Sequence, residues 1–328
     1  MRRRDFFTLF GGAAAAWPLV ARAQQPERMR RIGVLTAFAE NDVEGQARAK
    51  AFLQRLQDLG WTDGRNVRIE FRWVTDPDHI RAIAAELIRL TPDVILAYGS
   101  PVLTALRRET SSIPIVFVQV TNPVGGGFVA SLAHPGGNIT GFTNFEFAIG
   151  GKWLETLKEI APDTRRVAVI LDPENPTASG YLGAIEAMAR SSGVEVTPAA
   201  GRDAADTERA IEVFARGPHG GVIVLPDIIA IVHRELFVAL AARHRLPAVY
   251  PLRLFAASGG LVSYGVDQIS QSRQAASYVD RILKGENPAD LPVQGPTRYE
   301  LVINLKTAKA IGLTMPPTVL TRADEVIE

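Results

Sequence analysis

Short apolar runs alternate with amphipathic stretches along most of the chain. The runs are rich in β-branched residues and carry little charge, which is typical of strands buried on both faces of a sheet. In the first half they are RIGVLT (31–36), DVILAY (93–98) and IPIVFVQV (113–120). Residues 66–74 instead alternate with a period of two, which predicts an edge or half-exposed strand.

Helices are predicted between these strands. Asn41 or Asp42 can cap a helix that continues to Leu59. Apolar residues recur at helical spacing between Asp78 and Leu90, which predicts a second amphipathic helix. Strands that alternate with helices in this way predict a parallel sheet with helices on both of its faces.

The second half of the chain repeats the order of the first. Its strands are predicted at residues 166–171, 193–200, 220–227 and 246–251. An internal repeat of this length predicts an α/β fold of two Rossmann-like lobes, each with a parallel sheet. The alternative is one large doubly wound sheet, because a generic βαβα rhythm shows some of the same regularity.

Three segments are predicted to cross between the lobes as strands or extended links. They are residues 136–145, 259–267 and 291–304, with a helix over 268–283 between the last two. Several crossings make a hinge with a defined closure and not a loose tether. The expected N-terminal lobe holds residues 24–143 and about 266–290, and the expected C-terminal lobe holds residues 144–265 and about 291–328.

Polar turns follow the carboxyl ends of the strands, where ligands bind in open α/β sheets. Three of these turns combine a good helix N-cap with proline at the first helical position. They are Ser100-Pro101 and Asn122-Pro123 in the first lobe and Asn175-Pro176 in the second. A helix start leaves free N–H groups that suit a carboxylate. An ordinary βα turn shows the same pattern, so a purely structural role is the alternative for each turn taken alone.

The strand ends of the two lobes are expected to face each other across one cleft. The first lobe offers Thr36, Tyr98, Gly99, Ser100, Thr121 and Asn122, and the second offers Asp172, Asn175, Asp227 and Tyr250. Asp227 has no cation adjacent in sequence and is a candidate for binding an ammonium group. A helix N-cap is its alternative role, and the two can coexist. Phe38, Tyr98 and Tyr250 would stack on an aromatic solute or belong to the core.

The first 23 residues are typical of an export signal. A basic start, RRRDFF (2–7), precedes an apolar stretch, and ARA (21–23) matches a cleavage site. The paired arginines resemble the twin-arginine export signal, with a general secretory signal as the alternative. We therefore expect cleavage after Ala23 and a periplasmic protein.

Composition narrows the function classes. The chain has no cysteine, which excludes disulfides and thiolate metal sites and argues against a lipid anchor on cysteine. The predicted signal contains four arginines and one aspartate, so its removal changes the formal charge from +1 to −2. The remainder has no basic block, so we expect no nucleic acid partner. The five histidines are scattered, and we expect neither a metal nor a cofactor.

Several segments resemble one protein family. They are IPIVFVQVTNPV (113–124), GFVASLAHPGGNITGF (127–142), RLPAVYPLRLFAASGGLVSYGVD (245–267), the run from YVDRILKGENP to GLTMPP (278–317) and RADEVIE (322–328). Over nearly all of residues 24–328 the chain is similar to the ABC-transporter substrate-binding proteins related to tryptophan-binding lipoproteins. The resemblance implies a type I periplasmic-binding fold, capture of a small solute, in characterised members an aromatic or other amino acid, and delivery to a membrane permease with an ATPase.

By position, the resemblance implies ligand contacts around Thr36, Ser100, Thr121-Asn122, Asp172–Asn175 and Asp227. The chain departs from the family pattern in two places. Asn122 stands where aspartate is usual before the proline, which leaves the charge of the ligand open. The lipoprotein cysteine is absent, which argues for a freely diffusing receptor. We also expect the receptor to be a monomer.

Two other function classes remain open. A periplasmic sensor that reports to a membrane receptor would have the same fold. An enzyme is disfavoured because the chain has no G-x-S-x-G elbow, no H-E-x-x-H and no complete P-loop. The loose G-x-G-x-x-A at residues 125–130 follows its turn instead of the strand end, so we interpret it as close packing.

Overall fold

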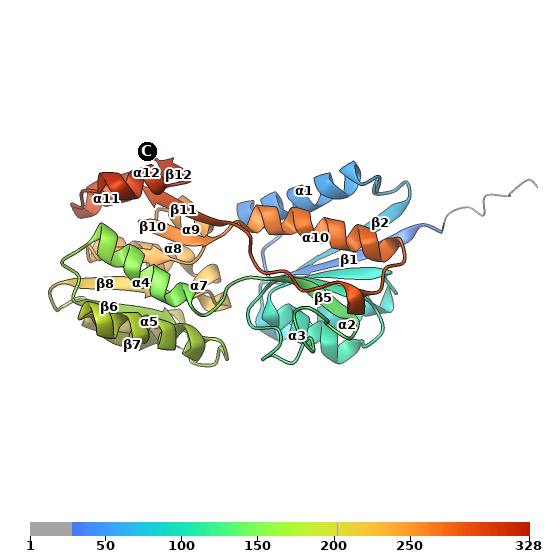
Figure 1. The fold of residues 1–328 in the computed structure, drawn as a ribbon, viewed down its shortest axis with the longest axis horizontal. Coiled ribbons are helices and arrows are strands. Elements are labelled where there is room, and N and C mark those ends of the chain that lie inside the picture. The colour runs from blue at the N-terminus through green and yellow to red at the C-terminus, as the bar shows by residue number, and fades with distance from the viewer. Residues whose placement is uncertain (1–27, 202) are drawn as a thin grey trace, which may run out of the picture.

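The structure is a computed structural model that describes residues 28–201 and 203–328, so the predicted export signal lies outside the described residues. Two α/β lobes lie side by side along the long axis of the molecule (Figure 1). The sheet of the first lobe has the strand order β2-β1-β3-β4-β5, with all neighbours parallel. Its strands are β1 (Arg30–Thr36), β2 (Val67–Trp73), β3 (Val94–Tyr98), β4 (Ile115–Val120) and β5 (Ile139–Thr143).

Helices cover both faces of this first sheet. α1 (Val43–Asp58) and α10 (Gln268–Leu283) pack against each other on one face (Figure 1). α2 (Ile80–Arg89), which follows the short 3₁₀ turn η1 (Pro77–His79), and α3 (Ser100–Glu109) pack on the other face. The alternation of side chains along β3 explains the two layers, because Leu96 belongs to the cluster under α1 and α10 while Ile95 belongs to the cluster under α2 and α3.

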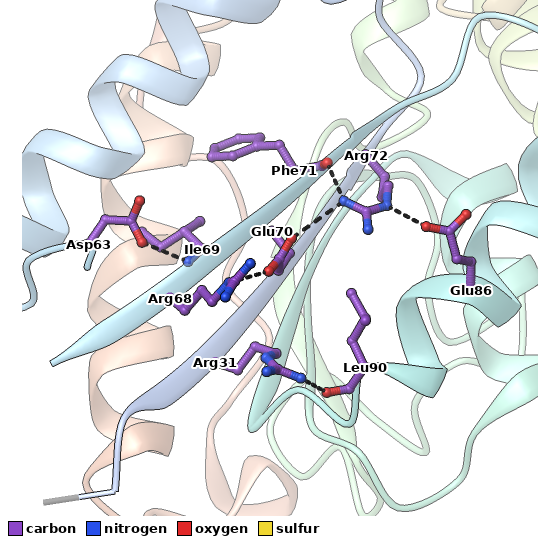
Figure 2. Close-up of polar contacts among 9 residues, drawn as sticks. All are labelled: Arg31, Asp63, Arg68, Ile69, Glu70, Phe71, Arg72, Glu86 and Leu90. Atoms are coloured by element: carbon purple, nitrogen blue, oxygen red, sulfur yellow. Dashed lines mark hydrogen bonds and ion pairs between the residues drawn. The ribbon is translucent and has the colours of Figure 1, made fainter. Parts of the chain in front are cut away.

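Strand β2 is the edge of the first sheet, as its alternating pattern predicts. Its outer side chains form a chain of ion pairs (Figure 2). Glu70 accepts from Arg68 at 2.6 Å and lies 3.6 Å from Arg72, which also pairs with Glu86 of α2 at 3.1 Å. Charged side chains on an edge strand oppose pairing with another sheet, so this edge is protected from aggregation.

The sheet of the second lobe has the order β12-β11-β10-β9-β8-β6-β7, with β10 and β11 antiparallel and the other neighbours parallel. Its strands are β6 (Arg166–Leu171), β7 (Glu195–Ala200), β8 (Gly220–Val224), β9 (Ala248–Tyr250), β10 (Val262–Val266), β11 (Tyr299–Asn304) and β12 (Glu325–Ile327). Its helices are α4 (Ile149–Ile160), α5 (Ala178–Ser192), α6 (Ala204–Phe214), α7 (Ile228–Val232), α8 (Arg234–Arg243), α9 (Arg253–Ala257), α11 (Leu305–Ile311) and α12 (Pro317–Arg322). Trp153, Tyr181 and Phe237 are among its largest fully buried side chains.

The chain passes between the lobes after β5, after β10 and after the short turn η2 (Pro288–Asp290), within the described residues. Each of the three segments predicted to cross contains a strand, β5, β10 or β11. The links between the lobes are the residues directly after β5, directly after β10 and directly before β11. The last crossing pairs with β5, the strand that leads into the first crossing, because Gln294 donates its N–H to Gly141 at 3.0 Å and accepts from Thr143 at 2.8 Å. This pairing holds the last crossing beside the start of the first.

Two of the predicted helix starts are wrong. Gly99, with φ of 88°, is the N-cap of α3, and Ser100 is its first helical residue. Glycine takes this position because a positive φ carries no steric cost for it. No helix follows Asn122, which has φ of 48° and accepts from the Gly125 N–H at 3.0 Å, so a series of turns replaces the predicted helix. In the third turn, Asn175 accepts from the N–H of Thr177, the N-cap of α5.

Candidate functional site

The carboxyl ends of the two sheets face each other. Thr121, directly after β4, shares a hydrogen bond of 2.9 Å with the Tyr181 hydroxyl of α5. Asp42, between β1 and α1, pairs with Arg234 of α8 at 2.8 Å. Each of these contacts joins segments that follow strands of different sheets, so the surfaces on which ligands bind in α/β folds are opposed.

A small cavity lies at the carboxyl edge of the first sheet. Its walls include Thr36, Phe38, Arg48, Trp73 and Tyr98. Thr36 and Tyr98 are the last residues of β1 and β3, which are neighbours in the sheet, and this adjacency brings two of the predicted site residues together. The cavity combines aromatic walls with a few polar groups, and its volume of about 10 Å³ is the space of roughly one water molecule.

Tyr98 is held in place from the helix above it. Its side chain is 5% exposed, and its hydroxyl donates to Ser272 of α10 at 3.1 Å. Burial raises the pKa of Tyr98, so its hydroxyl remains protonated at neutral pH. The ring can therefore contact an uncharged part of a ligand without bringing a negative charge.

Arg48 is a site residue that the sequence reasoning missed. It lies on the buried face of α1, in the same row as Phe52 and Leu56, and is 2% exposed. Its guanidinium lies over the ring of Phe38, 4.7 Å from the centroid. Burial lowers the pKa of Arg48 from its ordinary value, and Glu44 opposes that shift. A charged residue on the apolar stripe of a helix is the signal that would have identified it.

Two predicted acids of the second lobe lie together. Asp227 is the N-cap of α7, accepting from Ala230 N–H at 2.6 Å, and it also accepts from Asp172 N–H at 3.3 Å. Burial is the main cause that raises the pKa of Asp227 to about 6. Asp172 itself accepts from the Glu174 N–H at 2.9 Å. The predicted cap role of Asp227 is therefore confirmed, and its role toward an ammonium group stays a prediction.

The remaining predicted residues make contacts within their own turns or belong to the core. Ser100 begins α3 and accepts at its carbonyl from Thr104 at 2.8 Å. Asn175 and Asn122 each use the side-chain oxygen within their own turns. Tyr250 is 1% exposed and stacks on Phe255, so its ring belongs to the core of the second lobe.

Metal and membrane features are absent from the described part of the chain. Among residues 28–201 and 203–328, no three His, Asp or Glu side chains gather in a way that could hold a metal ion. Over the same residues, no helix combines the length and the apolar character that crossing a membrane needs.

Comparison with known proteins agrees with this arrangement. The tyrosine-binding protein of Clostridioides difficile (strain R20291) is 26% identical over 288 residues, which cover 88% of this chain and 82% of that protein. A solved structure of a conserved domain protein from Vibrio cholerae is 27% identical, with a TM-score of 0.84 over 91% of this chain and 100% of the solved chain. An ABC domain from Streptococcus pneumoniae in complex with L-Trp is 23% identical, with a TM-score of 0.83 over 91% of this chain and 99% of the other.

These likenesses place the two lobes in the type I periplasmic-binding fold. The sequence model described as "ABC transporter substrate binding protein" matches residues 32–327, which is nearly all of the described chain. The chain therefore belongs to the family of ABC transporter substrate-binding proteins.

Proposed function

We propose that this chain is the periplasmic solute receptor of an ABC importer, and that it captures an amino acid or a similar carboxylate between its lobes. The observation that carries the proposal is the opposition of the two sheets' carboxyl ends, with hydrogen-bonding and charged side chains from both lobes meeting there. A ligand held between such surfaces is enclosed when the lobes close about the crossings. The lobes of this hinge are residues 24–143 with about 266–290, and residues 144–265 with about 291–328.

An aromatic amino acid is the solute that the walls favour. Phe38, Trp73 and Tyr98 line the cavity of the first lobe and offer rings on which an aromatic side chain packs. The relatives bind solutes of this kind: one is named for tyrosine, and another was solved with L-Trp. The importer then requires a permease in the inner membrane, which receives the closed, loaded receptor.

Calorimetric titration of residues 24–328 tests the proposal. The panel contains L-tyrosine, L-tryptophan, L-phenylalanine, L-leucine and L-glutamate. It also contains allitol, a polyol that has no carboxylate and no aromatic ring. We expect at least one aromatic amino acid to bind with a Kd of about 1 μM or lower, and we expect the radius of gyration from X-ray scattering to fall at saturation. Binding of allitol alone, or an unchanged radius at saturation, would contradict the proposed solute class or the proposed closure, respectively.

A further inference from the structure

Arg48 is a buried cation that lacks a counter-ion among the described residues. Its Nε and Nη1 atoms are inaccessible to solvent and have no hydrogen-bond partner there. The side chain is 2% exposed, and no carboxylate of the described chain lies within ion-pair distance of it. Leaving a buried charge without a partner is costly, so such groups are retained where they bind something.

Three acids, Glu44, Asp42 and Glu300, act electrostatically on Arg48, and none of them forms an ion pair with it. Asp42 accepts from the Gly45 N–H at 2.9 Å with one oxygen and pairs with Arg234 at 2.8 Å with the other. Glu44 pairs with Arg253 of α9 at 3.2 Å. The pairs of Asp42 and Glu44 both reach across to the second lobe, so these two acids act on the Arg48 charge only from beyond ion-pair distance.

Arg48 lines a cavity of about 10 Å³, which a solute can enter only if the walls of the cavity move apart. The cavity that it lines contains Thr36 and Tyr98, at the edge of the sheet where α/β proteins bind their ligands. The rings of Phe38 and Trp73 form apolar walls in the same cavity. An anion that entered here would meet a fixed guanidinium, because stacking on Phe38 orients the plane of Arg48.

We propose that Arg48 is the anion receptor of the solute site, binding the carboxylate of the solute while Phe38 and Trp73 pack on its apolar part. This inference rests on the proposed function and deepens it by naming the recognised group. It moves the carboxylate away from the turns at Ser100 and Asn122, where the sequence alone had put it. Arginine suits this task because its planar fork donates two parallel hydrogen bonds to one carboxylate.

The test compares three variants, each freed of co-purified solute by denaturation and refolding. Arg48→Met removes the charge at similar length, and Arg48→Lys keeps the charge without the fork. Arg166→Met is the matched control, because Arg166 also lies over a ring, 4.5 Å from the Phe214 centroid, at the amino end of β6. The probes are L-tyrosine, L-tryptophan and benzoate, with tyramine as the probe that lacks a carboxylate.

We expect Arg48→Met to weaken the binding of every carboxylate that the unaltered protein binds by at least about a hundredfold, and Arg48→Lys by about tenfold. Arg166→Met is expected to leave these affinities within twofold, and tyramine binding is expected to respond little to any variant. Without solute, Arg48→Met is expected to raise the melting temperature by about 2 °C or more, because it removes an unpaired buried charge.

The outcomes separate this inference from the proposed function. Unchanged carboxylate affinity in Arg48→Met, or a lower solute-free melting temperature in that variant, overturns the role of Arg48 even if amino acids bind. Binding of benzoate that depends on Arg48, without binding of any amino acid, supports the anion receptor and removes the amino-acid proposal. Failure of all three carboxylates to bind the unaltered protein overturns both.

Discussion

At the scale of single residues, two buried ionisable side chains show opposite arrangements. Both carboxylate oxygens of Asp227 accept from backbone N–H groups, those of Ala230 and Asp172. The Nε and Nη1 atoms of Arg48 have no partner among the described residues. A satisfied buried group contributes to the fold, whereas an unsatisfied one weakens it, so their substitution should have opposite effects on stability.

Asp227 also predicts a pH dependence. Burial raises its pKa from 3.8 in the unfolded chain to about 6 in the folded protein, so the folded state binds this proton more tightly. Its contribution to stability is therefore fully present below pH 3.8 and is lost as the pH rises through about 6. Asp227→Asn keeps a capping oxygen but cannot ionise. The unfolding free energy of the variant, minus that of the unaltered protein, should therefore increase between pH 4 and pH 7.

Urea unfolding at several pH values measures this difference. Asp203→Asn is the matched control, because Asp203 is also a helix N-cap, accepting from Asp206 N–H at 2.8 Å, but is exposed. Asp227→Ala should cost about 1 kcal/mol or more below pH 4, because the α7 cap is lost, and this cost should shrink as the pH rises through about 6. A pH-independent difference between Asp227→Asn and the unaltered protein would contradict the assignment.

At the scale of elements, β10 joins the second sheet through a very close approach. A Cβ at Gly265 would lie 1.8 Å from the carbonyl oxygen of Pro251, which follows β9. Backbone cannot yield as a flexible side chain does, so Gly265→Ala must push β10 away from the end of β9. We expect a loss of about 3 kcal/mol or more of unfolding free energy, measured by urea denaturation.

Gly295 provides the control for this prediction. It lies in the last crossing, and a Cβ there would meet no atom within 4 Å. Gly295→Ala should therefore change the unfolding free energy by less than about 1 kcal/mol. Equal effects of the two substitutions would show that the approach of β10 to Pro251 is unimportant.

At the scale of the whole molecule, ion pairs join the two lobes. Asp42 pairs with Arg234, and their side chains are 8% and 23% exposed. Asp42 is also the N-cap of α1, and asparagine caps equally well, so Asp42→Asn removes the charge and keeps the cap. We expect Asp42→Asn and Arg234→Gln each to raise the solute-free radius of gyration and to weaken binding of the calorimetrically identified solute about three- to tenfold.

A double-mutant cycle isolates this pair from other effects. The combined variant should lose less affinity than the two single losses predict, with a coupling of about 0.5–1 kcal/mol. The control pair is Arg68 and Glu70 (Figure 2), which both belong to β2, the edge strand of the first sheet. Coupling near zero between Asp42 and Arg234 would mean that their contact does not stabilise closure.

Local patterns in the chain predicted most of the strands and their order. Apolar periodicity predicted parallel strands, the alternation along residues 66–74 predicted the edge strand β2, and the helix predicted over 268–283 matches α10, Gln268–Leu283. These features rest on interactions among residues a few positions apart, which a sequence pattern displays directly. The same patterns placed Thr36 and Tyr98 together, because neighbouring parallel strands end at one edge.

Which polar groups meet became visible only once the chain was folded. It showed Gly99 and not Ser100 as the N-cap of α3, turns and not a helix after Asn122, and Tyr250 as a core ring. It also left Arg48 buried beside Phe38 while the nearby acids pair with the other lobe. The physical reason is that burial and ion pairing depend on residues far apart in the chain, whose distances no local pattern of apolar and polar positions contains.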